Sequence, residues 1–233
     1  MSDDDTLEDL RHARVAAASH PRRASPDDTR ALAHLFAAAF MTDPVMDWIA
    51  RLGPKRAEGL ERFFSWLLQV RAIPFGEVWM SDDASVCAAW LPPDAPASPG
   101  GLFEQLKLLP VFVQLCGFTR LVRGQAMADA MEKNHPYERH YYLAFIAVAP
   151  RFQGVGLGSA ILEASLARID EMGLPAYLEN SNPKNTPLYE RNGFVTRKNI
   201  APADYPPLFS MWRAPVTTGD TPTRYRAGPT AAR

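Results

Sequence analysis

Apolar side chains recur at two spacings along the chain, and each spacing predicts a type of secondary structure. Repeats of three or four residues are typical of amphipathic helices, and alternation of apolar and polar residues is typical of strands. The helical spacing covers residues 25–42, 56–70, 158–172 and 188–191. The strand spacing covers residues 77–80, 86–91, 141–148, 176–179, 194–197 and 208–212. A mixed chain of the α+β class, with no internal repeat, is therefore expected.

Polar and cyclic residues set the connections between the first elements. Ser25 or Asp27 is expected to cap the first helix, because short polar side chains accept hydrogen bonds from free helix amides. Asp43 and Pro44 are expected to break the pattern near its end. The strands within residues 77–91 are joined by the short polar turn SDDAS, which predicts a hairpin.

A long apolar segment separates the hairpin from the second half of the chain. Residues 102–122 are interrupted at Pro110 and Gly117, which predicts two short helices. A further helix is expected to finish before Asn134, where an Asn-His-Pro sequence begins.

Residues 141–179 have the order strand, helix, strand. Two strands joined by a helix are usually parallel neighbours in one sheet. With 233 residues, of which 47% are hydrophobic, the chain suits one domain, expected over residues 16–213. Residues 1–15 are charged and alanine-rich, and residues 214–233 have few large apolar side chains, so both ends are expected to be loose tails.

Composition excludes several classes of function. A formal charge of -1 and an isoelectric point near 6.5 give no basic field, so no nucleic-acid partner is expected. The acidic start and the lack of a long apolar run predict no signal peptide and no membrane partner, and hence a cytoplasmic protein. Cys87 and Cys116 have no CxxC partner and are expected to be buried reduced thiols. The histidines lack metal-ligand spacing, so no metal is expected.

The segment of highest interest is a glycine-rich stretch between a predicted strand and a predicted helix. Gly154, Gly156 and Gly158 alternate there, and the amides from Gln153 onward are expected to converge on a phosphate at the helix N-terminus. Two alternatives stay open from the residues alone. One is a tight turn in which glycine serves packing only, and the other is a dinucleotide site with Glu179 as its ribose-binding acid. The GxGxG spacing matches the GxGxxG of a dinucleotide fold poorly.

A second motif follows in the right order. The pattern Gln153-x-x-Gly156-x-Gly158 precedes a helix and a strand, and then comes LYERNGF from Leu188 to Phe194. This combination resembles the GNAT superfamily of acyl-CoA-dependent N-acetyltransferases. The resemblance implies an α/β/α layered GNAT fold, with a mixed central sheet whose central parallel strands splay apart. Over residues 25–212 the order of segments is similar to that of puromycin N-acetyltransferase and its relatives.

The resemblance also implies a cofactor, acetyl-CoA, and the residues that hold it. In the family, the glycine loop holds the pyrophosphate and the preceding strand pairs with the pantetheine arm. Asn182 is alternatively the start of an Asx turn. The cofactor-binding residues expected here are Ile146, Ala147, Val148, Gln153, Gly154, Val155, Gly156, Leu157, Gly158, Ser159, Asn182, Asn185 and Tyr189.

Two residues are expected to be catalytic. Transfer to an amine requires removal of its proton, and Glu179, at a strand end, is the predicted base. Its alternative is a strand-end glutamate that points into solvent or bonds to backbone amides. Tyr189 is the acid that the family implies, with a side chain that merely fills the sheet face as the alternative. A backbone amide at a bulge within residues 145–147 is expected to polarise the carbonyl group.

The acceptor pocket is expected to combine aromatic walls with a carboxylate. Phe40, Asp43, Trp48 and Tyr142 are the predicted substrate-binding residues, although core packing or helix capping also explains the first three. Alternation along the strand allows only one of Tyr141 and Tyr142 to face the cleft. His135 and His140 have two alternatives, namely surface positions, which are the default expectation, and positions that face the acceptor.

These features together predict an enzyme that acetylates a primary amine of a small molecule, such as an antibiotic or a metabolite. A peptide or protein N-terminus is an alternative acceptor. A non-catalytic acyl-CoA-binding sensor is an alternative of another class. The expected state is a monomer or a homodimer.

Overall fold

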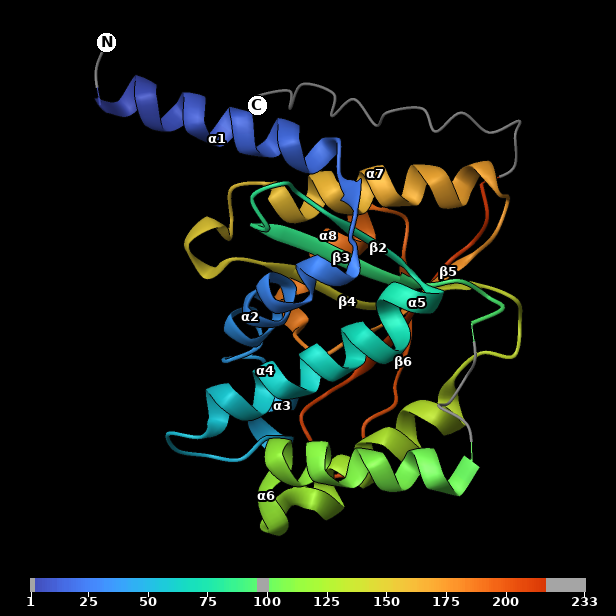
Figure 1. Cartoon of the computed structure of the whole chain (residues 1–233). Coiled ribbons are helices and arrows are strands. Elements are labelled where there is room, and N and C mark those ends of the chain that lie inside the picture. Colours follow the sequence, from blue (N-terminus) through green and yellow to red (C-terminus); the bar gives the residue numbers. More distant parts are fainter. Residues whose placement is uncertain (1–2, 96–100, 217–233) are drawn as a thin grey trace, which may run out of the picture.

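A seven-stranded mixed sheet forms the centre of the molecule (Figure 1). The computed structural model describes residues 3–95 and 101–216. The strand order is β1-β2-β3-β4-β5-β7-β6. The strands are β1 (Arg22–Arg23), β2 (Glu77–Met80), β3 (Val86–Leu91), β4 (Tyr141–Val148), β5 (Ala176–Asn180), β6 (Val195–Asn199) and β7 (Phe209–Arg213). Within the described residues, β4 and β5 form the parallel pair that the strand-helix-strand order predicts. The other neighbouring strands pair antiparallel.

Helices cover both faces of this sheet. The helices are α1 (Asp3–Ser19), α2 (Thr29–Ala39), α3 (Pro44–Ile49), α4 (Arg56–Leu67), α5 (Ile73–Phe75), α6 (Gly101–Asn134), α7 (Leu157–Glu171) and α8 (Thr186–Arg191). Shorter helical turns are η1 (Pro26–Asp28), η2 (Leu68–Ala72), η3 (Pro150–Phe152) and η4 (Pro183–Asn185). Figure 1 shows α1 and α7 on one face, and α2, α3, α4 and α6 on the other. The α/β/α layering predicted from the sequence is confirmed.

Two hydrophobic cores lie on opposite faces of the sheet, because side chains alternate along each strand. In β3, Val86 and Trp90 pack with α7, whereas Cys87 and Ala89 pack with α2 and α4. Both cysteines are free and buried, as expected.

A β-bulge at Ala144 changes this alternation in β4. Ala89 pairs with Phe145 while the next β3 residue, Trp90, pairs with Leu143, so Ala144 is an extra residue. As a result Leu143 and Ile146 both pack in the core beneath α7, and Phe145 packs in the opposite core. The bulge is thus one residue earlier than the predicted range of 145–147.

The strands β4 and β5 separate part-way along their length. Their pairing ends at Leu143 and Leu178, although β4 continues to Val148 and β5 to Asn180. Beyond that point the two strands leave a gap in the middle of the sheet. The splayed parallel strands expected from the sequence are confirmed.

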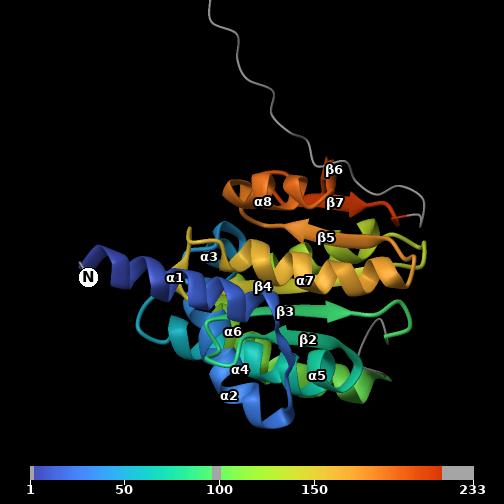
Figure 2. The same ribbon diagram turned by 90° about the horizontal axis from the view of Figure 1, so that it is seen from above.

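The N-terminal segment differs from the prediction of a loose tail over residues 1–15. It forms α1, which lies along α7 on the outer side of the molecule (Figures 1 and 2). Ala18 is fully buried and Val15 packs beside it in the core beneath α7. Short alanine and valine side chains suffice for this contact, and alanine favours helix. The predicted tail at 214–233 lies outside the described residues beyond residue 216.

Two predicted breaks behave differently in the structure. The helix α2 already ends at Ala39, and Asp43 and Pro44 instead start α3. The Asp43 carboxylate accepts hydrogen bonds of 3.0 Å from the amides of Val45 and Met46. In α6 the break lies at Gly117, with a φ of 64°, and not at Pro110. The helix then continues to Asn134.

In the part of the chain that the structure describes, no helix has both the length and the apolar character needed to span a membrane.

Candidate active site

A cavity of about 840 Å³ opens where β4 and β5 separate. One end is lined by the loop before α7, and the middle by β4 and β5. The other end is lined by α2, α3, α4 and α6. The cavity therefore joins the glycine motif to the predicted catalytic and acceptor residues.

Glycine in the loop serves backbone conformation more than packing. Gly154 and Gly156 have φ angles of +79° and +101°, a region that side chains of L-residues rarely adopt. A Cβ atom on Gly154 would meet no atom within 4 Å, so no neighbour requires glycine there. Added Cβ atoms on Gly156 and Gly158 would lie 3.6 Å from Val15 and 3.5 Å from Val148, which are ordinary contact distances, so packing does not require glycine there either.

The amides at the start of α7 are available to an anion. Leu157, Gly158 and Ser159 line the cavity and precede Ala160, whose amide donates to the Gly156 carbonyl at 3.0 Å. The first amides of a helix have no acceptor within the helix, and the helix dipole makes this end positive. These two properties suit a phosphate group.

Two residues of the predicted loop set are placed differently from the rest. The Gln153 amide donates to the Pro150 carbonyl at 3.3 Å, so it does not join the set of free amides. Its side chain donates to the Val148 carbonyl at 3.3 Å. Val155 does not line the cavity but packs toward the core beneath α7. The other predicted cofactor-binding residues line the cavity, from Ile146 in β4 to Tyr189 in α8.

The exposed edge of β4 provides a second set of backbone groups. The Ala149 amide donates to the Ser85 carbonyl at 2.8 Å, so this residue points its backbone groups toward β3. Because backbone groups alternate in direction along a strand, those of Ile146 and Val148 point toward the gap left by β5. An extended ligand in the gap can therefore pair with β4 as a strand would.

Glu179 lies at the end of β5 with its side chain only 2% exposed. It lines the cavity, and its buried Oε1 atom has no hydrogen-bond partner among the described residues. The His135 Nδ1 atom, 3.8 Å from this oxygen, belongs to a side chain that is 38% exposed. The alternative of a glutamate pointing into solvent is excluded by this burial.

Aromatic rings surround the Glu179 carboxylate. The rings of Tyr142 and Tyr177 are tilted by 34° with their centres 5.9 Å apart, and His135 packs edge-on against both. Burial, followed by the nearby Glu179 charge, raises the pKa of both tyrosines, so both phenols keep their protons. His140 is buried and not on the surface as predicted, and burial lowers its pKa.

Tyr189 is buried in α8 and lines the cavity beside Asp43. Burial and then the Asp43 charge raise the pKa of Tyr189 above its usual value of about 10. Its phenol is therefore protonated at neutral pH. The ring also packs edge-on against Phe194 at 6.1 Å, so the packing role considered for this residue is real as well.

Asp43 is placed as a cap, although it also lines the cavity. One carboxylate oxygen accepts from the amides of α3, and the other accepts from the Ser181 hydroxyl at 2.5 Å. Burial raises its pKa. Since both oxygens have partners, Glu179 is the carboxylate in this cavity with an unpartnered buried oxygen.

The acceptor end of the cavity is lined mainly by apolar side chains. Phe40 and Tyr142 line it as predicted, and Tyr141 faces the opposite core. Trp48 does not line the cavity: its ring packs against Tyr205 at 5.7 Å and beneath the Arg123 guanidinium at 4.2 Å. The sequence analysis did not predict the helix α3, which contains Trp48, and therefore gave the wrong direction for the Trp48 side chain.

Sequence reasoning also missed the lining contributed by α4 and α6. The residues concerned are Phe63, Phe112, Leu115, Cys116, Met127 and Met131. A signal was available, because residues 102–134 hold more large apolar side chains than one solvent-facing helix needs.

Within the described residues, no group of three or more His, Cys, Asp or Glu side chains is placed to hold a metal ion.

Comparison with known proteins agrees with this geometry. The family model described as "Acetyltransferase (GNAT) family" matches residues 108–194, which include β4, the glycine loop, α7 and α8. A crystal structure from Corynebacterium glutamicum, described as histone acetyltransferase HPA2 and related acetyltransferase, superposes with a TM-score of 0.64. It is 23% identical, and the match covers 86% of this chain and 98% of that one. The chain has the GNAT fold.

Two further proteins are similar to this chain, one in sequence and one in structure. A protein of Schizosaccharomyces pombe, described as an uncharacterized N-acetyltransferase, is 32% identical over 79 residues. That match spans 34% of this chain and only 31% of the relative's length. The structure of a Drosophila melanogaster polyamine N-acetyltransferase has a TM-score of 0.54 at 13% identity, covering 83% of this chain and 98% of that one. The comparisons thus show similarity to GNAT acetyltransferases over residues 108–194 and a GNAT fold for the chain.

Proposed function

We propose that this chain transfers an acetyl group from acetyl-CoA to a primary amine of a small, partly apolar molecule. The observation that carries the proposal is the unpartnered Glu179 oxygen, buried in the same cavity as the free amides at the start of α7. One end of that cavity suits a diphosphate, and the other offers a base beside an apolar wall.

The described residues fit coenzyme A. The diphosphate would be held by the amides of Gly154, Gly156 and the first turn of α7. The pantetheine arm would be held by the edge of β4 at Ile146 and at the Val148 amide, because the Val148 carbonyl already accepts from the Gln153 side chain. Asn182 and Asn185 also line the cavity near the loop. The Asn182 side chain accepts from the Lys184 amide at 3.1 Å, so it shapes the turn whether or not it contacts the cofactor.

Bound acetyl-CoA supplies the acetyl group as an activated thioester. Glu179 accepts the proton from the amine, which must be neutral to attack. The His135 Nδ1 atom lies 3.8 Å from Glu179 Oε1 on a side chain that is 38% exposed, so it offers this proton a way toward solvent. Tyr189 donates a proton to the departing sulfur, because its raised pKa keeps the phenol protonated at neutral pH.

The acceptor end favours a small molecule over a peptide. Side chains of α6, including Phe112 and Met127, line this end opposite β4, where an extended peptide would need an open groove. An apolar wall with one unpartnered carboxylate suits an amine that carries an apolar body. The likeness to puromycin N-acetyltransferase in the order of segments agrees with such an acceptor.

We also propose a cytoplasmic monomer or homodimer with no nucleic-acid or membrane partner.

The test is to incubate the protein with acetyl-CoA and a panel of amines, and to follow the release of free thiol. The panel contains arylalkylamines, short alkylamines, polyamines, an aminoacyl nucleoside and peptides with free N-termini. Fastest turnover is expected with aromatic or branched primary amines. Turnover of the peptides alone would instead support the protein N-terminal acetyltransferase. Binding of acetyl-CoA with no turnover of any amine would favour the sensor module.

A further inference from the structure

We propose that α1 braces the phosphate-binding loop, and that Arg11, Arg14 and Val15 are positioning residues for the diphosphate of coenzyme A. This inference rests on the proposed function for the identity of the ligand. The brace itself is built from contacts between α1, the loop and the turn that joins β2 to β3.

The Arg14 side chain joins the loop to the rest of the molecule. Its guanidinium carbon lies 4.0 Å from the centre of the Phe152 ring, at the start of the loop. The same guanidinium forms an ion pair with Asp83 in the β2–β3 turn. Arg151 lies over the same ring at 4.7 Å. The ring of Phe152 is thus held by two cations, one of them supplied by α1.

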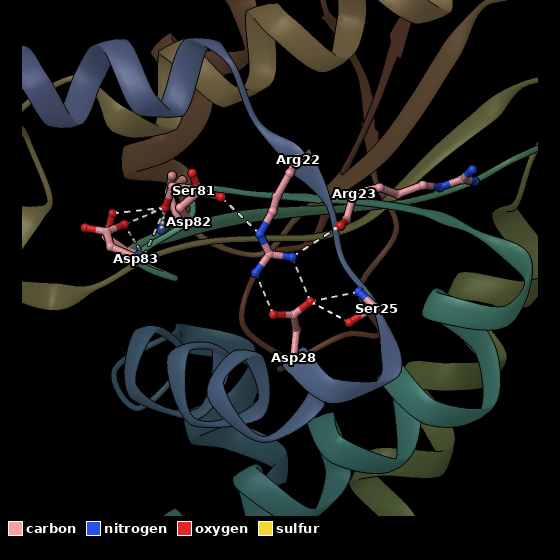
Figure 3. A network of polar contacts seen from close by, with 9 residues as sticks. Arg22, Arg23, Ser25, Asp28, Ser81, Asp82 and Asp83 are labelled. Carbon is pink, nitrogen blue, oxygen red and sulfur yellow. Dashed lines mark hydrogen bonds and ion pairs between the residues drawn. The ribbon is translucent and has the colours of Figure 1, made fainter.

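Asp83 is a rigid anchor for this contact. Its Oδ1 atom accepts hydrogen bonds from the Ser81 hydroxyl at 2.8 Å and from the Ser85 amide at 3.0 Å (Figure 3). The neighbouring Asp82 pairs with Arg22 at 3.0 Å, just after the end of α1 (Figure 3). Two arginine–aspartate pairs therefore fix the N-terminal segment to one turn of the sheet.

Val15 and Arg11 act on the centre of the loop. A Cβ atom on Gly156 would lie 3.6 Å from Val15 Cγ2, so α1 lies directly behind this glycine. The Arg11 Nε atom donates to the Val155 carbonyl at 3.4 Å. A trans peptide points its N–H opposite to its C=O. Holding the Val155 carbonyl toward α1 therefore turns the Gly156 N–H away from α1, to the side where the cavity lies.

The loop needs such support because of its composition. Glycine loses more conformational freedom on ordering than any other residue, so an unsupported glycine loop becomes costly to order around a ligand. A helix packed behind the loop fixes its peptide planes before the ligand arrives, which is how supporting residues sharpen a binding site. The predicted effect is on binding of the phosphate end of the cofactor, not on chemistry at Glu179.

The experiment compares full-length protein with three variants. Arg11→Ala combined with Arg14→Ala weakens the brace, and deletion of residues 1–19 removes it. Arg168→Ala is the matched control, because its guanidinium stacks on Trp79 at 4.1 Å, away from the loop. Each protein is titrated with coenzyme A and assayed with acetyl-CoA and with acetyl-pantetheine, which lacks the phosphates. Hydrogen exchange of residues 152–159 is measured without any ligand.

For the Arg11 and Arg14 variant, we expect the Kd for coenzyme A and the KM for acetyl-CoA to rise about tenfold. The value of kcat at saturation and the KM for acetyl-pantetheine should stay unchanged, and loop exchange should accelerate. Arg168→Ala should leave all of these values unchanged. If the deletion variant fails to fold, the comparison of the combined Arg11→Ala and Arg14→Ala variant with Arg168→Ala tests the proposal.

The proposal is overturned if loop exchange and coenzyme A affinity match the wild type in the arginine variant, or if both donors lose affinity equally. Failure of the proposed function looks different. The wild-type protein would then bind no coenzyme A, and the ligand-free exchange measurement would still decide whether α1 orders the loop.

Discussion

At the scale of single residues, Glu179 and Asp43 are two buried carboxylates in one cavity with different partners. Hydrogen bonds to α3 and Ser181 occupy both oxygens of Asp43, whereas Oε1 of Glu179 has no partner among the described residues. Both oxygens of Asp43 are thus occupied by contacts within the fold, although burial raises its pKa, whereas Oε1 of Glu179 is open to a ligand in the cavity. We therefore assign capping to Asp43 and propose Glu179 as the base.

Glu179→Gln tests this assignment. The amide cannot accept the proton of the amine, so kcat/KM should fall about a hundredfold, while acetyl-CoA binding is unchanged. The measurement is the steady-state rate between about pH 6 and 9 with the best amine of the panel. Glu163→Gln, on the exposed side of α7, is the control and should behave as wild type. A full rate for Glu179→Gln at every pH would remove this residue from the mechanism.

Tyr189→Phe tests the acid at the other side of the reacting group. Its hydroxyl is the only atom removed, so the ring still packs on Phe194 and the fold should be retained. We expect kcat to fall by about ten- to a hundredfold with little change in KM. Tyr137→Phe, whose ring is fully exposed, is the matched control. Unchanged turnover would mean that water supplies this proton.

Side-chain direction was the part of the site that the sequence could not supply. The motif places Gly154, Gly156 and Tyr189 along the chain, and all three line the cavity as predicted. Burial of Glu179 and exclusion of Trp48 depend on the short helix α3 and on packing between distant segments. Alternation correctly separated Tyr141 from Tyr142, because that rule is local.

At the scale of elements, the loop before α7 depends on two left-handed glycines. Gly154→Ala should strain the backbone by about 1–2 kcal/mol and move the amides, so that the Kd for coenzyme A rises more than tenfold. Gly173→Ala is a close match, since Gly173 has a φ of +64° and, like Gly154, no atom within 4 Å of an added Cβ.

Both substitutions should cost similar stability, measured by denaturant unfolding. Only Gly154→Ala should weaken coenzyme A binding in a calorimetric titration. Equal affinities in the two variants would show that the loop does not hold the phosphates.

Elements with regular apolar spacing were predictable, and those with weak spacing were not. The hairpin of β2 and β3 and the unit from β4 to β5 lie where the pattern placed them, within about a residue or two. The helix α1 was missed because its buried positions are alanine and valine, which resemble a solvated tail in composition. The kink of α6 lies at Gly117, whose φ of 64° is non-helical, and not at Pro110, so the glycine conformation and not the proline sets the break.

At the scale of the whole molecule, polar contacts fix the N-terminal segment to the sheet. Arg22 forms a bidentate pair with Asp28, with N–O distances of 2.6 and 2.8 Å. The hydrogen bond from Arg22 holds the pKa of Asp28 well below its usual range. A lowered folded-state pKa adds stability that is complete above the unfolded pKa of about 3.9, and this stability is lost as the pH falls below it.

Asp28→Asn should therefore lower the free energy of unfolding by about 1 kcal/mol at neutral pH, and the difference from wild type should shrink in strong acid. Urea unfolding at several pH values measures this. Asp27→Asn, a neighbouring exposed aspartate, is the control and should show a smaller change. A difference that stays constant down to about pH 2 would contradict the ion-pair explanation.

The central claim is that free amides at the start of α7 bind the diphosphate of a coenzyme A thioester. Calorimetric titration of the purified chain with acetyl-CoA, with NAD and FMN in parallel, tests it most directly. We predict one saturable site for acetyl-CoA, with an affinity that Gly154→Ala weakens, and no heat from NAD or FMN. An absence of binding to acetyl-CoA, or tight binding of NAD or FMN in its place, would contradict the account.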